Sequence, residues 1–146
     1  MTGIILDTNV ISELVRPRPS ASVLDWFSHT DSRQLATTSI TVAELFSGIR
    51  RMPEGQRRRQ LAKAIDFALL PLLDSIHPFN ATAAIEYAEV RDIRERAGRP
   101  IGVQDAMIAA IARSQDAALA TRNVRDFEGT GVTVVDPWHR TDADAR

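Results

Sequence analysis

The sequence has no cysteine, a single lysine and no long apolar run. Without cysteine the chain can form neither a disulfide framework nor a thiolate zinc site, and it has no cysteine nucleophile. The apolar stretch FALLPLL at 67–73 is too short to span a bilayer. The first residues also lack the basic segment typical of a signal peptide. We therefore expect a cytoplasmic protein with no membrane contact.

Several ligand-binding motifs are missing as well. No G-x-G-x-x-G follows the first apolar run, which argues against a dinucleotide-binding domain. A receiver or phosphatase-type domain also ends its first strand on an aspartate. This alternative is weakened because no Asp-x-Asp surrounds Asp7, and because Lys63 falls in a polar helix rather than after a strand. The net charge of −1 gives no global basic surface for coating DNA.

Short apolar runs alternate with segments of helical periodicity. We predict five strands, at 3–6, 34–38, 75–79, 117–121 and 132–136. We predict helices at 9–15, 20–30 (with Ser20 as cap), 39–52, 54–73, 80–98 (with Asn80 as cap and Gly98 as stop) and 101–115. Strands separated by helices indicate parallel pairing, hence an α/β/α sandwich with a central parallel sheet. We expect one domain over 1–146, with a frayed tail of about eight residues.

Three acids occupy positions from which they can reach one shared site. Asp7 ends the first predicted strand, and Glu44 and Asp105 are placed in the first turns of the helices at 39–52 and 101–115. The carboxyl ends of parallel strands, and the amino ends of the helices that follow them, lie at one edge of a sheet. The three carboxylates are therefore expected to converge there.

Each acid also has a purely structural explanation. Asp7 can cap the helix that follows it, and Asp105 can interact with the dipole of its own helix. Glu44 lies three residues after Thr41, which is the spacing of a capping box. Their apolar flanks nevertheless call for a compensating partner, and no lysine or histidine lies nearby in sequence. Oxygen ligands alone suit Mg²⁺ or Mn²⁺, so a divalent cation is the simplest partner.

A fourth polar segment follows the predicted strand at 117–121. It places Thr121 and Asn123 at the same edge of the sheet as the three acids, with Asp126 farther along the loop. An ordinary polar turn is the alternative explanation of this segment, and for Asp126 it is equally well supported.

Four motifs in this order resemble the PIN-domain ribonucleases, above all the VapC-type toxins and their FitB-like relatives. The motifs are LDTNVISEL at 6–14, TVAEL at 41–45, PIGVQDAMIAAIA at 100–112 and LATRNVRDF at 119–127. The resemblance runs from Ile4 to about Val135. It implies a PIN-like α/β/α fold with a Mg²⁺-dependent acidic site that cleaves RNA.

Carried over by position, the resemblance makes Asp7, Glu44 and Asp105 the core catalytic acids. Asp7 and Asp105 would ligate the metal, and Glu44 would hold it through water or act as a base. Many PIN domains carry a fourth acid where this chain has Asn123, with Asp126 three residues later. This departure puts a site of four acids and two metal ions in question.

The resemblance also implies supporting and substrate-binding residues. Thr8, Asn9, Thr121 and Asn123 would orient the attacking water or the phosphate. Arg122 and Arg125 would hold the RNA backbone. The arginine cluster at 50–59 is another RNA-binding candidate, although a solvated helical face explains it at least as well.

The implied function is the toxin of a type II toxin–antitoxin pair. Its partners would be the RNA substrate, a small antitoxin whose tail blocks the acidic site, and a second copy of the chain in a homodimer or larger assembly. The alternative is a FitB-like subunit of a DNA-binding regulatory complex with weak or no nuclease activity.

Overall fold

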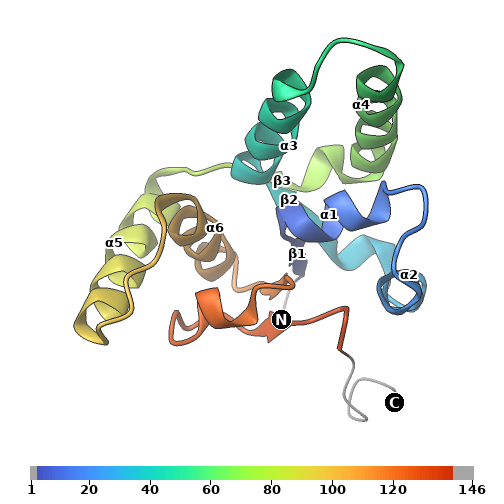
Figure 1. Cartoon of the computed structure of the whole chain (residues 1–146). Helices are drawn as coiled ribbons and strands as arrows, with labels where there is room; N and C mark the ends of the chain where they lie inside the picture. Colours follow the sequence, from blue (N-terminus) through green and yellow to red (C-terminus); the bar gives the residue numbers. More distant parts are fainter. Residues whose placement is uncertain (1–2, 140–146) are drawn as a thin grey trace.

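The centre of the molecule is a five-stranded sheet, seen in the computed structural model, which describes residues 3–139 (Figure 1). Its strands are β1 (Ile4–Leu6), β2 (Leu35–Thr38), β3 (Ile76–His77), β4 (Ala118–Ala120) and β5 (Val134–Val135). They lie in the order β3-β2-β1-β4-β5, and every neighbouring pair is parallel. All five predicted strands are confirmed. The predicted frayed tail, from residue 140 onward, falls outside the described residues.

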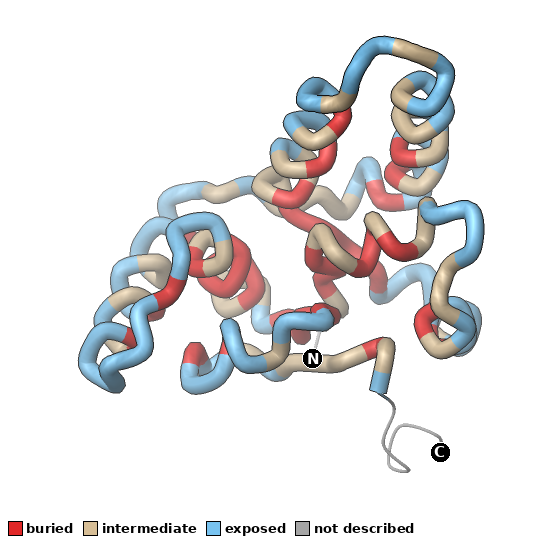
Figure 2. Tube along the Cα trace, in the orientation of Figure 1, coloured by how far each residue is buried: buried red, intermediate tan, exposed pale blue. Residues whose placement is uncertain are grey.

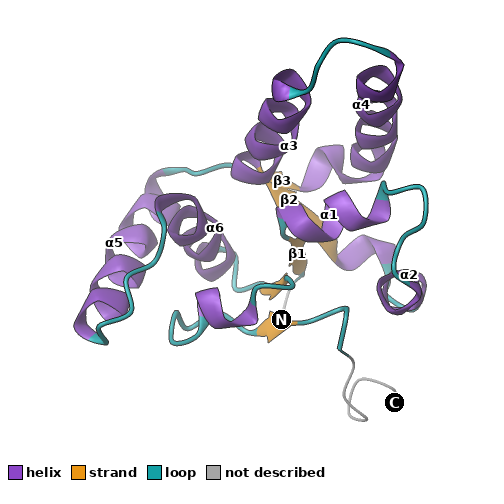
Figure 3. Cartoon of the chain, in the orientation of Figure 1, coloured by secondary structure: helices purple, strands orange, loops and turns teal. Residues whose placement is uncertain are grey.

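Helices surround the sheet (Figure 3). They are α1 (Thr8–Leu14), α2 (Ala21–Ser28), α3 (Ser39–Arg51), α4 (Gln56–Leu69), α5 (Ala81–Arg96) and α6 (Val103–Ser114), with 3₁₀ turns η1 (Ser32–Gln34), η2 (Leu70–Ser75) and η3 (Val124–Phe127). The predicted helix at 54–73 is too long, because the chain passes into η2 where Pro71 lacks a backbone donor. Within residues 3–139, no helix combines the length and apolar character needed to cross a membrane.

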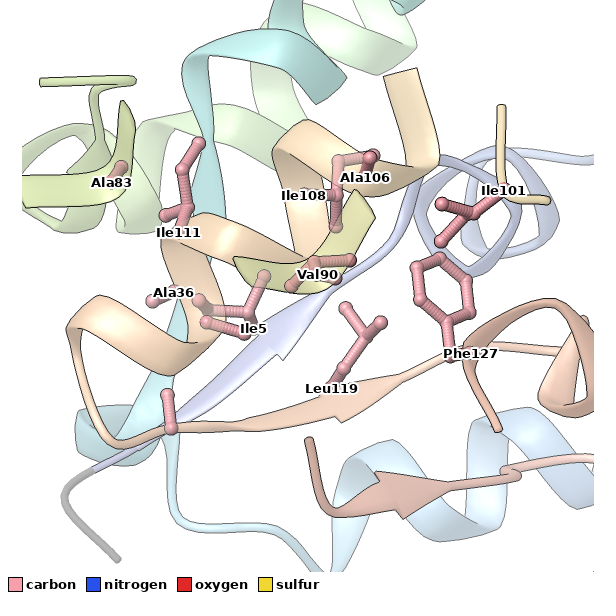
Figure 4. Packing of buried hydrophobic residues seen from close by; sticks show 13 residues of the cluster. Ile5, Ala36, Ala83, Val90, Ile101, Ala106, Ile108, Ile111, Leu119 and Phe127 are labelled. Carbon is pink, nitrogen blue, oxygen red and sulfur yellow. The ribbon is translucent and has the colours of Figure 1, made fainter. Parts of the chain in front are cut away.

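Alternating strand residues feed two apolar clusters, one on each face of the sheet. Ile5 and Leu119 point toward α5 and α6, where Phe127 lies beside Ile101 (Figure 4). Their sequence neighbours point to the opposite face, beneath α1, α3 and α4. This is the period of two expected of strands covered on both sides. The strands β1, β2 and β4 are accordingly buried almost throughout, and the predicted α/β/α sandwich is confirmed (Figure 2).

Two helices begin at their predicted caps, but only one of these caps makes the expected side-chain hydrogen bond. The Asn80 side chain accepts a hydrogen bond from the Ala83 N–H at 3.0 Å, and Gly98 has a φ of 69° just past α5. Ser20 occupies the cap position of α2, but its side chain makes no capping hydrogen bond. Its backbone N–H donates to Oε1 of Glu13 at 2.9 Å, so the predicted cap position is confirmed although the side-chain hydrogen bond of a cap is not made.

The connection order changes direction at β1. The chain builds β2 and β3 on one side of β1 and then returns to place β4 and β5 on the other side. In open α/β sheets, a crevice forms at such a reversal, outside the carboxyl ends of the strands. Asp7 is the first residue after β1 and therefore lies at this crevice.

Candidate active site

Asp7 is a buried carboxylate with a defined use for each oxygen. Its Oδ1 accepts the Thr8 N–H at 2.8 Å and caps α1, as the structural explanation requires. Its Oδ2 accepts the Thr121 hydroxyl at 2.7 Å and so ties the end of β1 to the end of β4. Burial outweighs these hydrogen bonds, and the pKa of Asp7 is raised. Capping is thus only part of its role in the structure.

The polar residues predicted to support Asp7 form a hydrogen-bond network around it. The Asn9 amide donates to Oδ2 of Asp7 at 3.4 Å and to the Thr121 hydroxyl at 3.2 Å. The Thr121 hydroxyl also accepts the Asn123 N–H at 3.1 Å, and the Arg122 N–H donates to Oδ1 of Asn9 at 3.2 Å. The loop after β4 is therefore fixed directly to the strand that delivers Asp7.

Glu44 differs from its predicted placement. The cap of α3 is Thr38, whose hydroxyl accepts the Thr41 N–H at 3.0 Å, and the first turn of α3 contains no acid. Glu44 therefore lies in the second turn, and the capping-box explanation is wrong. Burial raises its pKa, and the charges of Asp7 and Asp105 raise it further. Its half-buried carboxylate thus faces the other two acids.

Asp105 lies in the first turn of α6, as predicted. Gly102 precedes this helix, so no side chain caps it, and no described residue donates a hydrogen bond to the Asp105 carboxylate. Burial, followed by the charges of Asp7 and Asp126, raises the pKa of Asp105 to about 6. This acid is the least compensated of the three.

The three acids line one groove of about 710 Å³ at the carboxyl edge of the sheet. Thr8, Asn9, Arg122 and Asn123 line the same groove. Asp126 and Arg125 lie instead in an adjoining depression of about 390 Å³. Asp126 still contributes its charge to the site, because it raises the pKa of both Asp7 and Asp105.

This donor set suits a hard divalent cation. The acids repel one another, and the neutral donors around them supply no positive charge. Carboxylate oxygens are the ligands that Mg²⁺ takes, usually while it keeps several waters. Among residues 3–139, no three acidic or histidine side chains are arranged to ligate a single ion directly. An ion held here would therefore be bound by few carboxylates and several waters.

The arginine cluster lies apart from this groove. Arg50, Arg58 and Arg59 line a separate depression of about 410 Å³ between α3 and α4. Arg58 donates to the Met52 carbonyl at 3.4 Å, and Arg57 and Arg59 are exposed. This placement agrees with a solvated helical face.

Two residues near the site were missed from the sequence. Trp138 lines the groove beside Arg122, and its position just after the last predicted strand could have indicated this. Arg94 is buried and donates to the carbonyls of Arg99 at 2.7 Å and Glu128 at 2.6 Å. It thereby ties the loop after η3 to the segment that leads into α6. Its position among several other charged residues of α5 gave no such signal.

The chain matches known proteins over almost its whole length. Residues 4–131 match the family model of the PIN domain. Plasmid stability protein StbB of Pseudomonas syringae pv. tomato is 41% identical over 92% of this chain and 98% of its own. VapC ribonuclease Y4jK of Sinorhizobium fredii is 38% identical, over 92% and 97% respectively. Toxin FitB of Neisseria gonorrhoeae is 36% identical, over 93% and 99%.

Solved structures agree in fold. The crystal structure of FitAcB from Neisseria gonorrhoeae superposes with a TM-score of 0.88 at 34% identity, covering 94% of this chain and 99% of the other. The structure of FitAB bound to an IR36 DNA fragment gives the same TM-score and identity, covering 94% and 97%.

Proposed function

This chain belongs to the PIN-domain family, and from that premise we propose that it is a metal-dependent endoribonuclease, the toxin of a toxin–antitoxin pair. One observation carries the proposal: Asp7, Glu44 and Asp105 line a single groove at the carboxyl edge of the sheet, where the charge of Asp7 raises the pKa of the other two acids. Relatives named as a toxin and as a VapC ribonuclease support it.

We propose Mg²⁺ as the cofactor, with Mn²⁺ as a substitute. When bound, such an ion supplies Lewis-acid polarisation of a phosphate and a more acidic water. Asp7 and Asp105 would hold it, and Glu44 would hold it through water. In this arrangement Thr121 fixes the orientation of the Asp7 carboxylate. Arg94 holds η3, the turn that contains Asp126, through the carbonyls of Arg125 and Glu128.

Glu44 is the proposed base for the attacking water. Its pKa is raised by burial and by the other acids, and a more basic carboxylate accepts a proton more readily. Thr8, Asn9 and Asn123 offer neutral hydrogen-bonding groups in the same groove to orient the water or the phosphate. Hydrolysis would leave a 5′-phosphate and a 3′-hydroxyl.

The proposed partners are an RNA substrate, an antitoxin-type subunit and a second copy of the chain. The solved structures of FitAcB and FitAB support a second kind of subunit. The two apolar clusters share one sheet, which supports a single domain.

The test is cleavage of structured and single-stranded RNAs in Mg²⁺, in Mn²⁺ and in EDTA. Asp7→Asn and Asp105→Asn should each lower the rate by more than about 100-fold. Asp74→Asn is the matched control, because Asp74 is exposed and precedes β3, at the opposite edge of the sheet. Cleavage that persists in EDTA, or in either site variant, would contradict the proposed mechanism.

A DNA-binding regulatory role is the second candidate. Two observations favour it: the relative FitAB is described as bound to DNA, and the groove carries Asn123 instead of a further acid. Folded wild-type protein that cleaves no RNA in a broad panel, but joins a partner on operator DNA in a mobility-shift assay, would favour this role.

A further inference from the structure

The groove of the proposed active site is lined by two chemically different groups of residues. One group is the three acids, and the other is Arg16, Arg122 and Trp138. The guanidinium carbon of Arg122 lies 5.2 Å from the centre of the Trp138 ring, which is the geometry of a cation–π pair. An exposed arginine is thus held against an aromatic face inside the groove.

Trp138 is a firm support for this arginine. Its backbone N–H donates to Oδ1 of Asp136 at 2.9 Å, and the Ser22 hydroxyl donates to the Pro137 and Trp138 carbonyls at 2.9 and 3.2 Å. The ring is half-buried against the apolar cluster beneath α1 and α3. The segment after β5 is therefore fixed to α2, and the ring has a defined position at the groove.

The main chain of Arg122 is fixed as well. Its N–H donates to Asn9 at 3.2 Å, and the preceding residue, Thr121, donates to Asp7 at 2.7 Å. Arg122 is therefore anchored at both ends, by the network of Asp7 and by the ring of Trp138. Such an arginine loses little conformational entropy when it binds an anion.

The charge of Arg122 lowers the pKa of Glu13, but Glu13 does not depend on Arg122 as its partner. The buried carboxylate of Glu13 already accepts hydrogen bonds from Arg16 at 3.1 Å and from the Ser20 N–H at 2.9 Å. The Arg122 guanidinium donates no hydrogen bond to any residue between 3 and 139 that the structure describes. Its donors are available for a ligand in the groove.

We propose that Arg122 binds a backbone phosphate of the RNA next to the scissile one, and that Trp138 is the positioning residue that holds it. The inference rests on the proposed function and adds a substrate subsite to it. An RNA strand that places one phosphate at the acids would carry the next phosphates along the groove. A planar guanidinium can bind a phosphate with two parallel hydrogen bonds.

The experiment measures binding of a fluorescently labelled single-stranded RNA by anisotropy, in Ca²⁺ and in the Asp105→Asn background to prevent cleavage. Arg122→Ala should weaken binding roughly tenfold and lower the slope of log affinity against log salt by about 0.7. Trp138→Leu should weaken binding roughly threefold to fivefold, and Trp138→Phe by less, because phenylalanine keeps an aromatic face. Arg33→Ala is the charge-matched control, since Arg33 is exposed and precedes β2 at the opposite edge.

A double-mutant cycle distinguishes positioning from direct contact. In the Arg122→Ala background, Trp138→Leu should cause no further loss of affinity and no further change of salt slope. Additive losses would overturn the positioning role and indicate that a base stacks directly on Trp138. Wild-type salt slopes in both single variants would overturn the phosphate subsite, while cleavage by the wild type would leave the proposed function standing. Absence of both binding and cleavage in the wild type would overturn the proposed function itself.

Discussion

The two sides of the acidic groove are built differently. On the strand side, Asp7 accepts hydrogen bonds from Thr8, Asn9 and Thr121. On the helix side, Asp105 accepts no hydrogen bond from the part of the chain that the structure describes, and its pKa rises to about 6. Burial raises the pKa of both carboxylates, but only Asp7 has hydrogen-bond donors that hold it in place.

The comparison shows that a protein can fix the position of a carboxylate without neutralising the negative charge of the groove. The strand side is held in place by the protein's own donors, so its geometry is present without any ion. The helix side carries negative charge that the fold leaves uncompensated, which destabilises the metal-free protein. A cation or a proton would relieve that cost.

Removing the Asp7 carboxylate should lower stability, whereas removing the Asp105 carboxylate should not. Asp7→Ala leaves the donors of Thr8 and Thr121 without their acceptor, and we expect a loss of about 2 kcal/mol. Asp105→Ala removes only a repelled charge, and we expect unchanged or slightly higher stability at pH 7.5. Urea denaturation in EDTA measures both free energies of unfolding. Equal losses in the two variants would show that the sides of the groove do not differ.

Thr121→Val tests the organised side without changing charge. The substitution keeps the side-chain shape but removes the hydroxyl that donates to Asp7 and accepts the Asn123 N–H. We expect a stability loss of about 1 kcal/mol and a roughly tenfold weaker apparent Mg²⁺ affinity, because the carboxylate loses its fixed orientation. Isothermal titration calorimetry with Mg²⁺ measures the second effect. Thr133→Val is the control, because Thr133 is exposed and its side chain makes no described hydrogen bond.

Periodicity predicted the sheet well because burial on both faces fixes which strand residues are apolar. It also placed Asp7 and Asp105 correctly, since strand ends and helix starts are marked in sequence. Glu44 was misplaced by one turn because Thr38 and Thr41 are both good caps, and only the structure shows that Thr38 is used. Trp138 and Arg94 act through contacts distant in sequence, which no local pattern reveals.

Asp105, on the helix side of the groove, should make the stability of the metal-free protein depend on pH. The pKa of Asp105 rises from 3.8 to about 6 on folding, so the folded state binds the proton more tightly. The resulting stability is present below about pH 4 and is lost as the pH rises through 6. After allowance for solvent screening of this half-buried group, we expect about 1 kcal/mol, or roughly 3 °C in Tm.

Thermal melts in EDTA from pH 5 to 8 measure this effect as the difference between wild type and Asp105→Asn. The difference is needed because His77, whose pKa is lowered by burial, acts in the opposite sense within the same range. Saturating Mg²⁺ should stabilise the wild type more than Asp105→Asn above pH 6, because the variant lacks one of the proposed ligands. A wild type and a variant with parallel pH profiles would contradict the assigned cause.

The smallest effect is expected from adding a charge at Asn123, at the edge of the hydrogen-bond network around Asp7. Asn123 is exposed at the groove and donates its backbone N–H to Thr121, so Asn123→Asp keeps that hydrogen bond while adding a carboxylate. In EDTA we expect a stability loss of less than about 1 kcal/mol, because the new charge is exposed to solvent in the same groove as Asp7 and Asp105. In Mg²⁺ the same charge should strengthen ion binding severalfold, so that the variant gains more thermal stability from the ion than the wild type does. Asp126→Asn should weaken ion binding and reduce the thermal stability gained from Mg²⁺. The reason is that the charge of Asp126, in the neighbouring depression, already acts on Asp7 and Asp105 and raises the pKa of each. Equal Mg²⁺-induced shifts in wild type and both variants would mean that the ion is held by the acids of the groove alone.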